Sequence, residues 1–140
     1  MAKPYQRIDT TADVGLASFG VSLNEAFANM AKGLFSLVTP LSRIRKKVSH
    51  RVEAQALSHE DLLIVWLNEL IFIRETRDLL FRYFKIISLD KNRLESICLG
   101  EPVDPNRHVL KMDIKAATYH RTSIWQDSHG LWHARVILDV

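Results

Sequence analysis

The chain has 140 residues, of which 47% are hydrophobic and 25% charged, the size and balance of one globular domain spanning residues 1–140. Its formal net charge of +3 is only mildly basic, and its single cysteine, Cys98, excludes an intramolecular disulfide and fits a reducing compartment. No apolar run reaches the ~18 residues that a bilayer crossing needs, so we expect a cytoplasmic protein without membrane association.

The N-terminal third predicts two short strands followed by a helix. Residues 5–9 and 14–19 have the composition of strands. Ser22 can accept a hydrogen bond from an early helical N–H, and Glu25 stands three positions later, which together form the capping box of a helix start. Apolar residues then recur at helical spacing until Pro40 ends the helix.

The middle of the chain predicts a strand and a second helix. Residues 47–56 alternate between polar and apolar side chains, which is the period of a half-buried strand. Ser58 is a good N-cap, and Glu60 and Asp61 stand favourably in the first turn that follows it. Residues 62–73 are apolar over much of the helix circumference, which predicts packing on more than one side.

The C-terminal part predicts strands separated by turns. The expected strands cover residues 81–89, 94–99, 109–118, 121–125 and 132–140. Clusters of Asp, Asn, Pro and Gly between several of them supply turn chemistry. We therefore predict an α+β fold, a two-layer sandwich in which two main helices pack on one face of a mainly antiparallel sheet.

A first polar cluster lies between the two opening strands. Asp9, Thr10, Thr11 and Asp13 place two carboxylates and two hydroxyls within five positions. Hard cations such as calcium and magnesium bind clustered oxygen ligands of this kind. The same side chains also hydrogen-bond ordinary turns, and the residues alone favour the turn.

A second polar cluster lies at the end of the chain. Asp139 ends an apolar strand, and the main-chain carboxylate of Val140 follows it directly. Two negative groups this close repel each other unless a cation or a basic side chain offsets them. A metal ion or a lysine would meet that need, and a solvated chain end would meet it equally well.

A third candidate is Lys115, which alternates with apolar neighbours and is expected to share a strand face with Lys111 and Asp113. A solvated polar face is the favoured interpretation, and a functional lysine is the alternative. If the segment ends that carry Asp13, Lys115 and Asp139 converge, they form one acidic pocket with a lysine on the rim of the sheet.

The densest basic run consists of Arg43, Arg45, Lys46 and Lys47. A solvated strand or loop is again the favoured interpretation. The alternative is a docking patch for RNA or for an acidic partner.

These segments, in this order, resemble the archease family. Residues 9–15 are similar to its opening motif, Asp-His-Thr-Ala-Asp-Val-Gly, and residues 22–27 and 61–70 are similar to its two helices. The stretches 100–101, 115–120 and 136–140 also correspond, so the resemblance covers essentially the whole chain. The sequence departs from the family at Thr10, which stands where a histidine is usual and cannot supply an imidazole.

The resemblance implies a divalent-cation site, usually calcium, with magnesium or manganese as alternatives. Its ligands would be Asp13, Asp139 and the main chain of Val140, and Lys115 matches the family's functional lysine.

The resemblance further implies an activator of an RtcB-type RNA ligase in tRNA splicing and RNA repair, with no reaction of its own. Such activators help the ligase to accept guanylate from GTP and to turn over repeatedly. The ligase is the expected partner, and any contact with RNA is expected to be indirect.

Two alternative functions belong to other classes. A stand-alone metal-dependent hydrolase or transferase would use Asp13, Asp139 and Lys115, but the sequence offers no obvious nucleophile, complete ligand set, zinc motif or glycine-rich phosphate loop. A chaperone-like RNA-processing adaptor would use the basic run, and its binding would fall steeply with salt. The oligomeric state and the role of Glu69, a carboxylate inside the apolar second helix, are left open.

Overall fold

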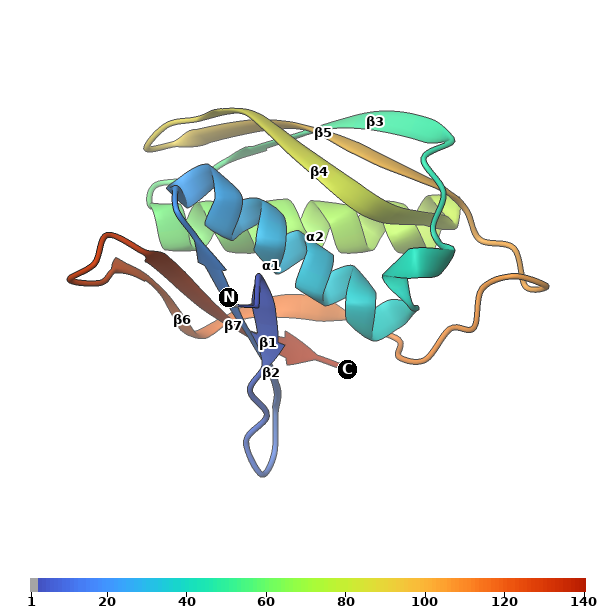
Figure 1. Ribbon diagram of the computed structural model, residues 1–140, viewed down its shortest axis with the longest axis horizontal. Coiled ribbons are helices and arrows are strands. Elements are labelled where there is room, and N and C mark those ends of the chain that lie inside the picture. The colour runs from blue at the N-terminus through green and yellow to red at the C-terminus, as the bar shows by residue number, and fades with distance from the viewer. Residues whose placement is uncertain (1–2) are drawn as a thin grey trace.

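Two antiparallel sheets enclose a layer of helices in the computed structural model, which describes residues 3–140 (Figure 1). One sheet has four strands in the order β1-β2-β7-β6, and the other has three in the order β3-β5-β4. In chain order the elements are β1 (Tyr5–Arg7), β2 (Val14–Gly20), α1 (Leu23–Val38), the short 3-10 helix η1 (Leu41–Arg43), β3 (Val48–Gln55), α2 (His59–Arg77), β4 (Leu79–Leu89), β5 (Arg93–Pro102), β6 (Ala116–Gln126) and β7 (Trp132–Asp139).

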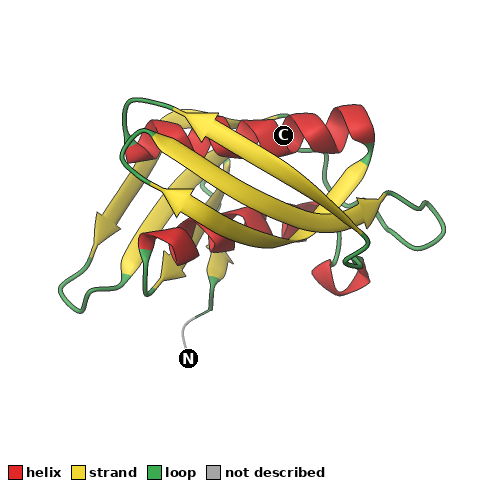
Figure 2. Ribbon diagram, turned by 90° about the horizontal axis from the view of Figure 1, so that it is seen from above, coloured by secondary structure: helices red, strands yellow, loops and turns green. Residues whose placement is uncertain are grey.

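The predicted α+β class is confirmed, but the strands divide between two sheets instead of forming one. Strands β3, β4 and β5 pair among themselves, whereas β6 and β7 return to β2. Both helices contact both sheets, α1 through β2 and β4 and α2 through β3 and β6. Figure 2, seen from the side of the three-stranded sheet, shows its strands crossing over the helices. Each sheet therefore has one face covered by helices and one face turned outward.

The helices begin where their caps were predicted. The hydroxyl of Ser22 accepts from the N–H of Glu25 over 3.1 Å, and that of Ser58 accepts from the N–H of Asp61 over 3.1 Å. Among residues 3–140, neither helix combines the length and the apolar character that a membrane crossing requires.

The core of the helical layer centres on Trp66, which is fully buried in α2. Its indole N–H donates to the hydroxyl of Ser96 over 3.0 Å, and that hydroxyl donates in turn to the carbonyl of Val52 over 2.8 Å. Cys98 is buried close to Ser96, and burial raises the pKa of its thiol to about 12. These contacts fix α2 to the inner face of the three-stranded sheet.

The strand predicted at 109–118 is wrong over residues 109–115. This segment crosses from one sheet to the other, and its backbone is bonded to the end of α1: the N–H of Lys111 donates to the carbonyl of Val38, and the hydroxyl of Thr39 donates to the carbonyl of Val109, both over 2.8 Å. The true strand β6 runs through the predicted break instead, with an irregularity between Thr118 and Ser123.

Candidate functional site

The predicted site residues lie on adjacent segment ends at one corner of the four-stranded sheet. Val14 of β2 pairs with Leu138 of β7, so Asp13 and Asp139 stand at the next step of the same ladder. On the other side of β7, the N–H of Lys115 donates to the carbonyl of Asp139 over 2.8 Å. The three segment ends therefore converge, with β7 in the middle. We call Asp13, Lys115, Asp139 and Val140 the acidic corner.

The acidic corner is open to solvent. Lys115, Asp139 and Val140 are exposed, and Asp13 is half-buried. Within residues 3–140, no basic side chain forms an ion pair with Asp13 or Asp139. The negative charge of the corner is thus not offset by an ion pair within the described part of the chain.

A divalent cation fits the corner only in part. No group of three or more His, Cys, Asp or Glu side chains in the described residues is placed to hold a metal ion. The corner offers two side-chain carboxylates and the main chain of Val140. Calcium takes roughly six to eight oxygen ligands, so water or a partner would have to supply the remainder. The donors are of the right chemical type but too few for a closed site.

The two carboxylates of the opening loop differ in their contacts. Asp9 accepts from the guanidinium of Arg7 over 2.7 Å and from the N–H of Gly15 over 3.3 Å, and the hydrogen bond from Arg7 lowers the pKa of Asp9. Asp13 receives one long side-chain contact, 3.4 Å from the hydroxyl of Thr10. Asp9 is therefore part of the turn, whereas the Thr10 contact is the one side-chain hydrogen bond of Asp13 within residues 3–140.

Sequence reasoning missed Asn68, whose amide fixes β6 to α2 close to the corner. Its Nδ2 donates to the carbonyl of Ala117 over 3.0 Å, and its Oδ1 accepts from the N–H of Ala117 over 2.8 Å. Ala117 follows Lys115 by two residues. A lone amide in an apolar helix was the available signal, but its partner could not be read from the sequence. The neighbouring Glu69 is exposed.

Replacing Asn68 with alanine is expected to lower the free energy of unfolding by about 2 kcal/mol, because both polar groups of the Ala117 backbone lose their partner. Urea-induced unfolding measures this loss. Glu69→Ala, next to it on the exposed side of α2, is the control and is expected to change stability by less than about 0.5 kcal/mol. Equal effects of the two substitutions would contradict the clamping role of Asn68.

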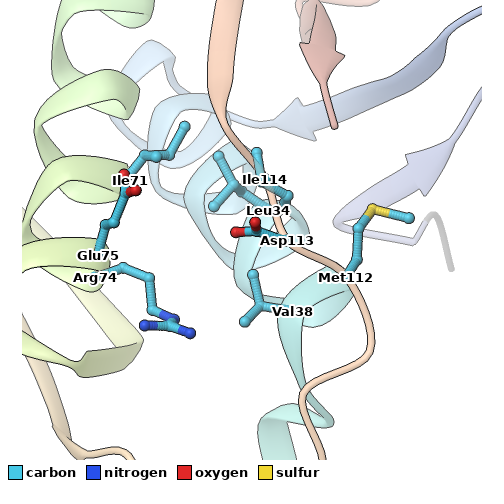
Figure 3. A pocket seen from close by; sticks show the side chains of 8 residues that line it. All are labelled: Leu34, Val38, Ile71, Arg74, Glu75, Met112, Asp113 and Ile114. Carbon is cyan, nitrogen blue, oxygen red and sulfur yellow. The ribbon is translucent and has the colours of Figure 1, made fainter.

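A small cavity lies between α1, α2 and the segment that leads to Lys115. Its volume is about 80 Å³, and Figure 3 shows apolar side chains of both helices with Arg74, Glu75 and Asp113 beside them. Drug-sized ligand pockets typically measure roughly 300–1,000 Å³, so a nucleotide would not fit inside this cavity. We interpret it as a packing gap beneath the crossing segment.

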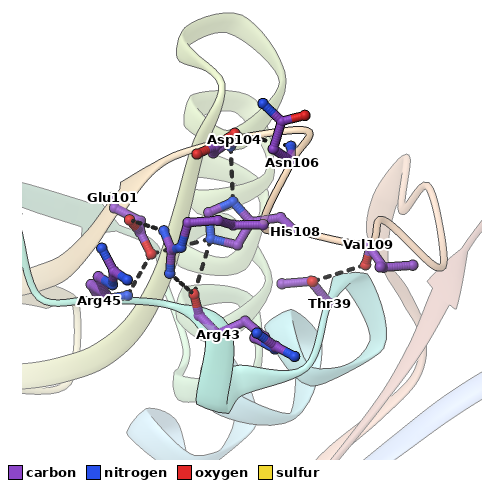
Figure 4. Close-up of polar contacts among 9 residues, drawn as sticks. Thr39, Arg43, Arg45, Glu101, Asp104, Asn106, His108 and Val109 are labelled. Carbon is purple, nitrogen blue, oxygen red and sulfur yellow. Dashed lines mark hydrogen bonds and ion pairs between the residues drawn. The ribbon is translucent and has the colours of Figure 1, made fainter.

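Another polar cluster, away from the acidic corner, is buried at the three-stranded sheet. It centres on Glu101 of β5, which is 2% exposed (Figure 4). Its carboxylate accepts from the guanidinium of Arg107 over 2.8 Å, from the N–H of Arg45 over 2.6 Å and from His108 Nε2 over 3.1 Å. Burial alone would raise the pKa of Glu101, but these hydrogen bonds lower it to about 2. Glu101 therefore stays ionised inside the protein.

The ring of His108 holds the loop after β5 in place. Its Nδ1 accepts from the N–H of Asp104 over 2.8 Å, so the hydrogen-bond pattern assigns the ring proton to Nε2. That nitrogen lies 3.0 Å from the carbonyl of Arg43 and 3.1 Å from Glu101. The groups of this cluster satisfy one another, and we interpret it as a structural link between β5, η1 and the following loop.

Comparison with known proteins identifies close relatives along the whole chain. The Archease protein family matches residues 5–140. The protein archease of Pyrococcus abyssi is 35% identical, and that of Methanothermobacter thermautotrophicus is 36% identical, each over 99% of both chains. Among solved structures, protein 1598 of Methanobacterium thermoautotrophicum matches with a TM-score of 0.84 at 34% identity, over 98% of this chain and 99% of that one.

A more distant solved structure supports the fold alone. It comes from Thermotoga maritima and is described as an archease and possible chaperone. It matches with a TM-score of 0.61 at 19% identity, over 100% of this chain and 98% of the other.

Proposed function

This chain belongs to the archease family, and on that premise we propose that it activates an RtcB-type RNA ligase in tRNA splicing and RNA repair. In this role the protein helps the ligase to accept guanylate from GTP and to turn over repeatedly. It does so from the cytoplasm and without a reaction of its own. The observation that carries the proposal is the acidic corner, where Asp13, Asp139 and Lys115 meet on an open rim.

The openness of the corner suits a protein partner better than a small substrate. Its exposed side chains can reach into another protein's active site. A divalent cation, calcium or alternatively magnesium or manganese, would be held by Asp13, Asp139 and the main chain of Val140. When bound, such a cation supplies charge neutralisation for phosphate groups. The short ligand set supports completion by the ligase or by water, and RNA would be contacted at this corner only through the ligase.

Lys115 adds an exposed positive charge beside the two carboxylates. Its backbone is fixed by the hydrogen bond to Asp139, while its side chain is exposed. An ammonium group can bind phosphate oxygens or a carboxylate of the partner as a compact point charge. The lysine would therefore help to position the nucleotide-bearing site of the ligase against the corner.

The test is multiple-turnover RNA ligation by an RtcB-type ligase from the same organism, with GTP and Mn²⁺ or Mg²⁺. Substoichiometric wild-type protein is expected to raise the turnover number. Asp139→Asn and Lys115→Ala are each expected to reduce this stimulation at least about tenfold, equivalent to about 1.4 kcal/mol, while thermal unfolding stays near that of the wild type. Glu69→Gln, an exposed carboxylate outside the corner, is the matched control and should stimulate normally.

Other outcomes would favour the alternative functions. Stimulation that persists in both corner variants would separate the activity from the corner. Metal-dependent hydrolysis or group transfer without any ligase would favour the stand-alone enzyme. Protection of the ligase from aggregation, with no change in turnover per active ligase, would favour a chaperone-like adaptor.

A further inference from the structure

Six cations without ion-pair partners lie on β4 and on the segment that leads into β3. They come from two segments that are distant in the sequence: Arg43, Arg45, Lys46 and Lys47 precede β3, and Arg82 and Lys85 belong to β4. In the described part of the chain none of them forms an ion pair. We call these residues the basic patch. The basic run in the sequence showed only the four residues that precede β3.

The ring of Tyr83 contacts one cation from each segment of the basic patch. The Nζ of Lys46 lies 4.7 Å from the ring centroid, and the guanidinium carbon of Arg82 lies 5.2 Å from it. At these distances the ring quadrupole attracts both cations. Tyr83 therefore brings two positive charges to one ring.

A bulge in β4 brings Arg82 to the same ring. Neighbouring side chains on a regular strand point to opposite faces. Here the pairing with β5 shifts between Phe81 and Tyr83, so Arg82 has no register partner and the alternation is interrupted. Gly100 opposite permits the close approach, because a Cβ there would lie 1.8 Å from the carbonyl oxygen of Leu80. The position of Arg82 beside the Tyr83 ring therefore depends on the backbone of β4.

Other cations of the three-stranded sheet are balanced by carboxylates. Arg51 pairs with Glu95 over 2.7 Å, and Arg93 pairs with Glu95 over 2.7 Å and with Glu53 over 3.7 Å. This contrast shows that the sheet does not simply carry an excess of cations everywhere. The positive charge without ion-pair partners lies before β3 and on β4, where Lys85 is level with Arg51 across β5.

The chemistry of the basic patch favours a phosphate backbone over a protein surface. The patch consists of cations, and the aromatic ring beside it is engaged by two of them. Protein interfaces depend on apolar and aromatic anchors, whereas nucleic acids are bound mainly through phosphate contacts. We propose that the basic patch binds the phosphate backbone of RNA.

This second site is separate from the acidic corner. The basic patch lies on β4 and the segment before β3, the corner lies on the four-stranded sheet, and the helices lie between the two sheets (Figure 1). RNA on the patch would leave the corner free for the ligase. The proposal goes beyond ligase activation and holds independently of it.

The proposal is tested by fluorescence anisotropy with a labelled single-stranded RNA of mixed sequence, without ligase, over a series of salt concentrations. Lys46→Gln combined with Lys85→Gln is expected to raise the Kd about tenfold at low salt and to make the slope of log Kd against log salt less steep by about 1.4, as for two lost phosphate contacts on a single strand. The charge-matched control combines Lys91→Gln with Lys111→Gln, two exposed lysines outside the patch, and should change the Kd less than about twofold.

A further variant separates geometry from net charge. Tyr83→Leu keeps every cation but removes the ring that gathers Lys46 and Arg82, so it is expected to raise the Kd about threefold. Thermal unfolding checks that the variants are folded. Equal losses in the patch and control pairs, or an absence of salt-dependent RNA binding, would overturn the proposal. Binding of polyglutamate as tight as that of RNA at the same salt would point to an acidic protein surface instead.

Discussion

Glu101→Gln is expected to lower the free energy of unfolding by about 3 kcal/mol at neutral pH, because it removes one charge of a buried ion pair and leaves the other. The side chain of Glu101 is 3% exposed and that of its partner Arg107 is 25% exposed, so neither charge is well solvated. Glutamine keeps the shape but cannot offer two acceptor oxygens to the guanidinium, the Arg45 N–H and His108. Urea unfolding of the two proteins measures the difference.

The pH dependence gives this prediction a sharper form. The folded pKa of Glu101 is about 2, below its ordinary value of 4.5, so folding favours the ionised carboxylate. Its contribution is fully present above about pH 4.5 and is lost as the pH falls through about 2. The stability difference between wild type and Glu101→Gln should therefore be constant at neutral pH and shrink progressively between those limits.

A matched control is available on the same strand. Glu95 also pairs with arginines, but the side chains of those arginines, Arg51 and Arg93, are 56% and 48% exposed. Glu95→Gln is expected to cost less than about 1 kcal/mol, since exposed ion pairs contribute little. A stability difference for Glu101→Gln that does not change with pH, or one no larger than that of Glu95→Gln, would show that the buried pair does not stabilise the fold as described.

Gly100→Ala is the second substitution with a large expected effect, a loss of at least about 3 kcal/mol. The added Cβ would lie 1.8 Å from the carbonyl oxygen of Leu80 and 2.8 Å from the Cα of Phe81. Both are backbone atoms of β4, so no side chain can turn away, and the two strands must separate. Thermal and urea unfolding measure the loss.

Gly130 is the comparison for this substitution. It has a φ of +82°, which strains any other residue, but a Cβ there would meet nothing closer than 3.7 Å, at the end of the Gln126 side chain. Gly130→Ala is expected to cost about 1 kcal/mol, the ordinary cost of a left-handed backbone. A loss of stability for Gly100→Ala no larger than that for Gly130→Ala would show that β4 and β5 can accommodate the added Cβ, which would contradict this explanation.

The local features of the fold could be predicted because they depend on neighbouring residues. Ser22 and Ser58 cap their helices through bonds that span three positions, and the period of β3 is visible in eight residues. The division into two sheets depends instead on pairings between distant strands. The wrong strand prediction over residues 109–115 has the same origin. Alternation of polar and apolar residues indicates which side chains are buried, but it does not indicate that the N–H of Lys111 donates to the carbonyl of Val38.

The candidate sites divide in the same way. Asp13, Lys115 and Asp139 could be proposed because each stands at or near the end of a recognisable apolar segment, and the family resemblance placed them together. The amide clamp of Asn68 could not be foreseen, since its partner is 49 positions away. The bulge at Arg82 also left no signal in the sequence, so the β4 part of the basic patch became visible only when β4 was placed beside the segment before β3.

The central position of β7 also determines the order in which the molecule can assemble. β4 and β5 follow each other through a tight turn, and β3 pairs with β5 across a shorter stretch of chain than β2 with β7, so the three-stranded sheet closes shorter loops. β7 must instead find β2 across most of the chain, and closing such a long loop is slow. We therefore expect the basic patch to form earlier in folding than the acidic corner.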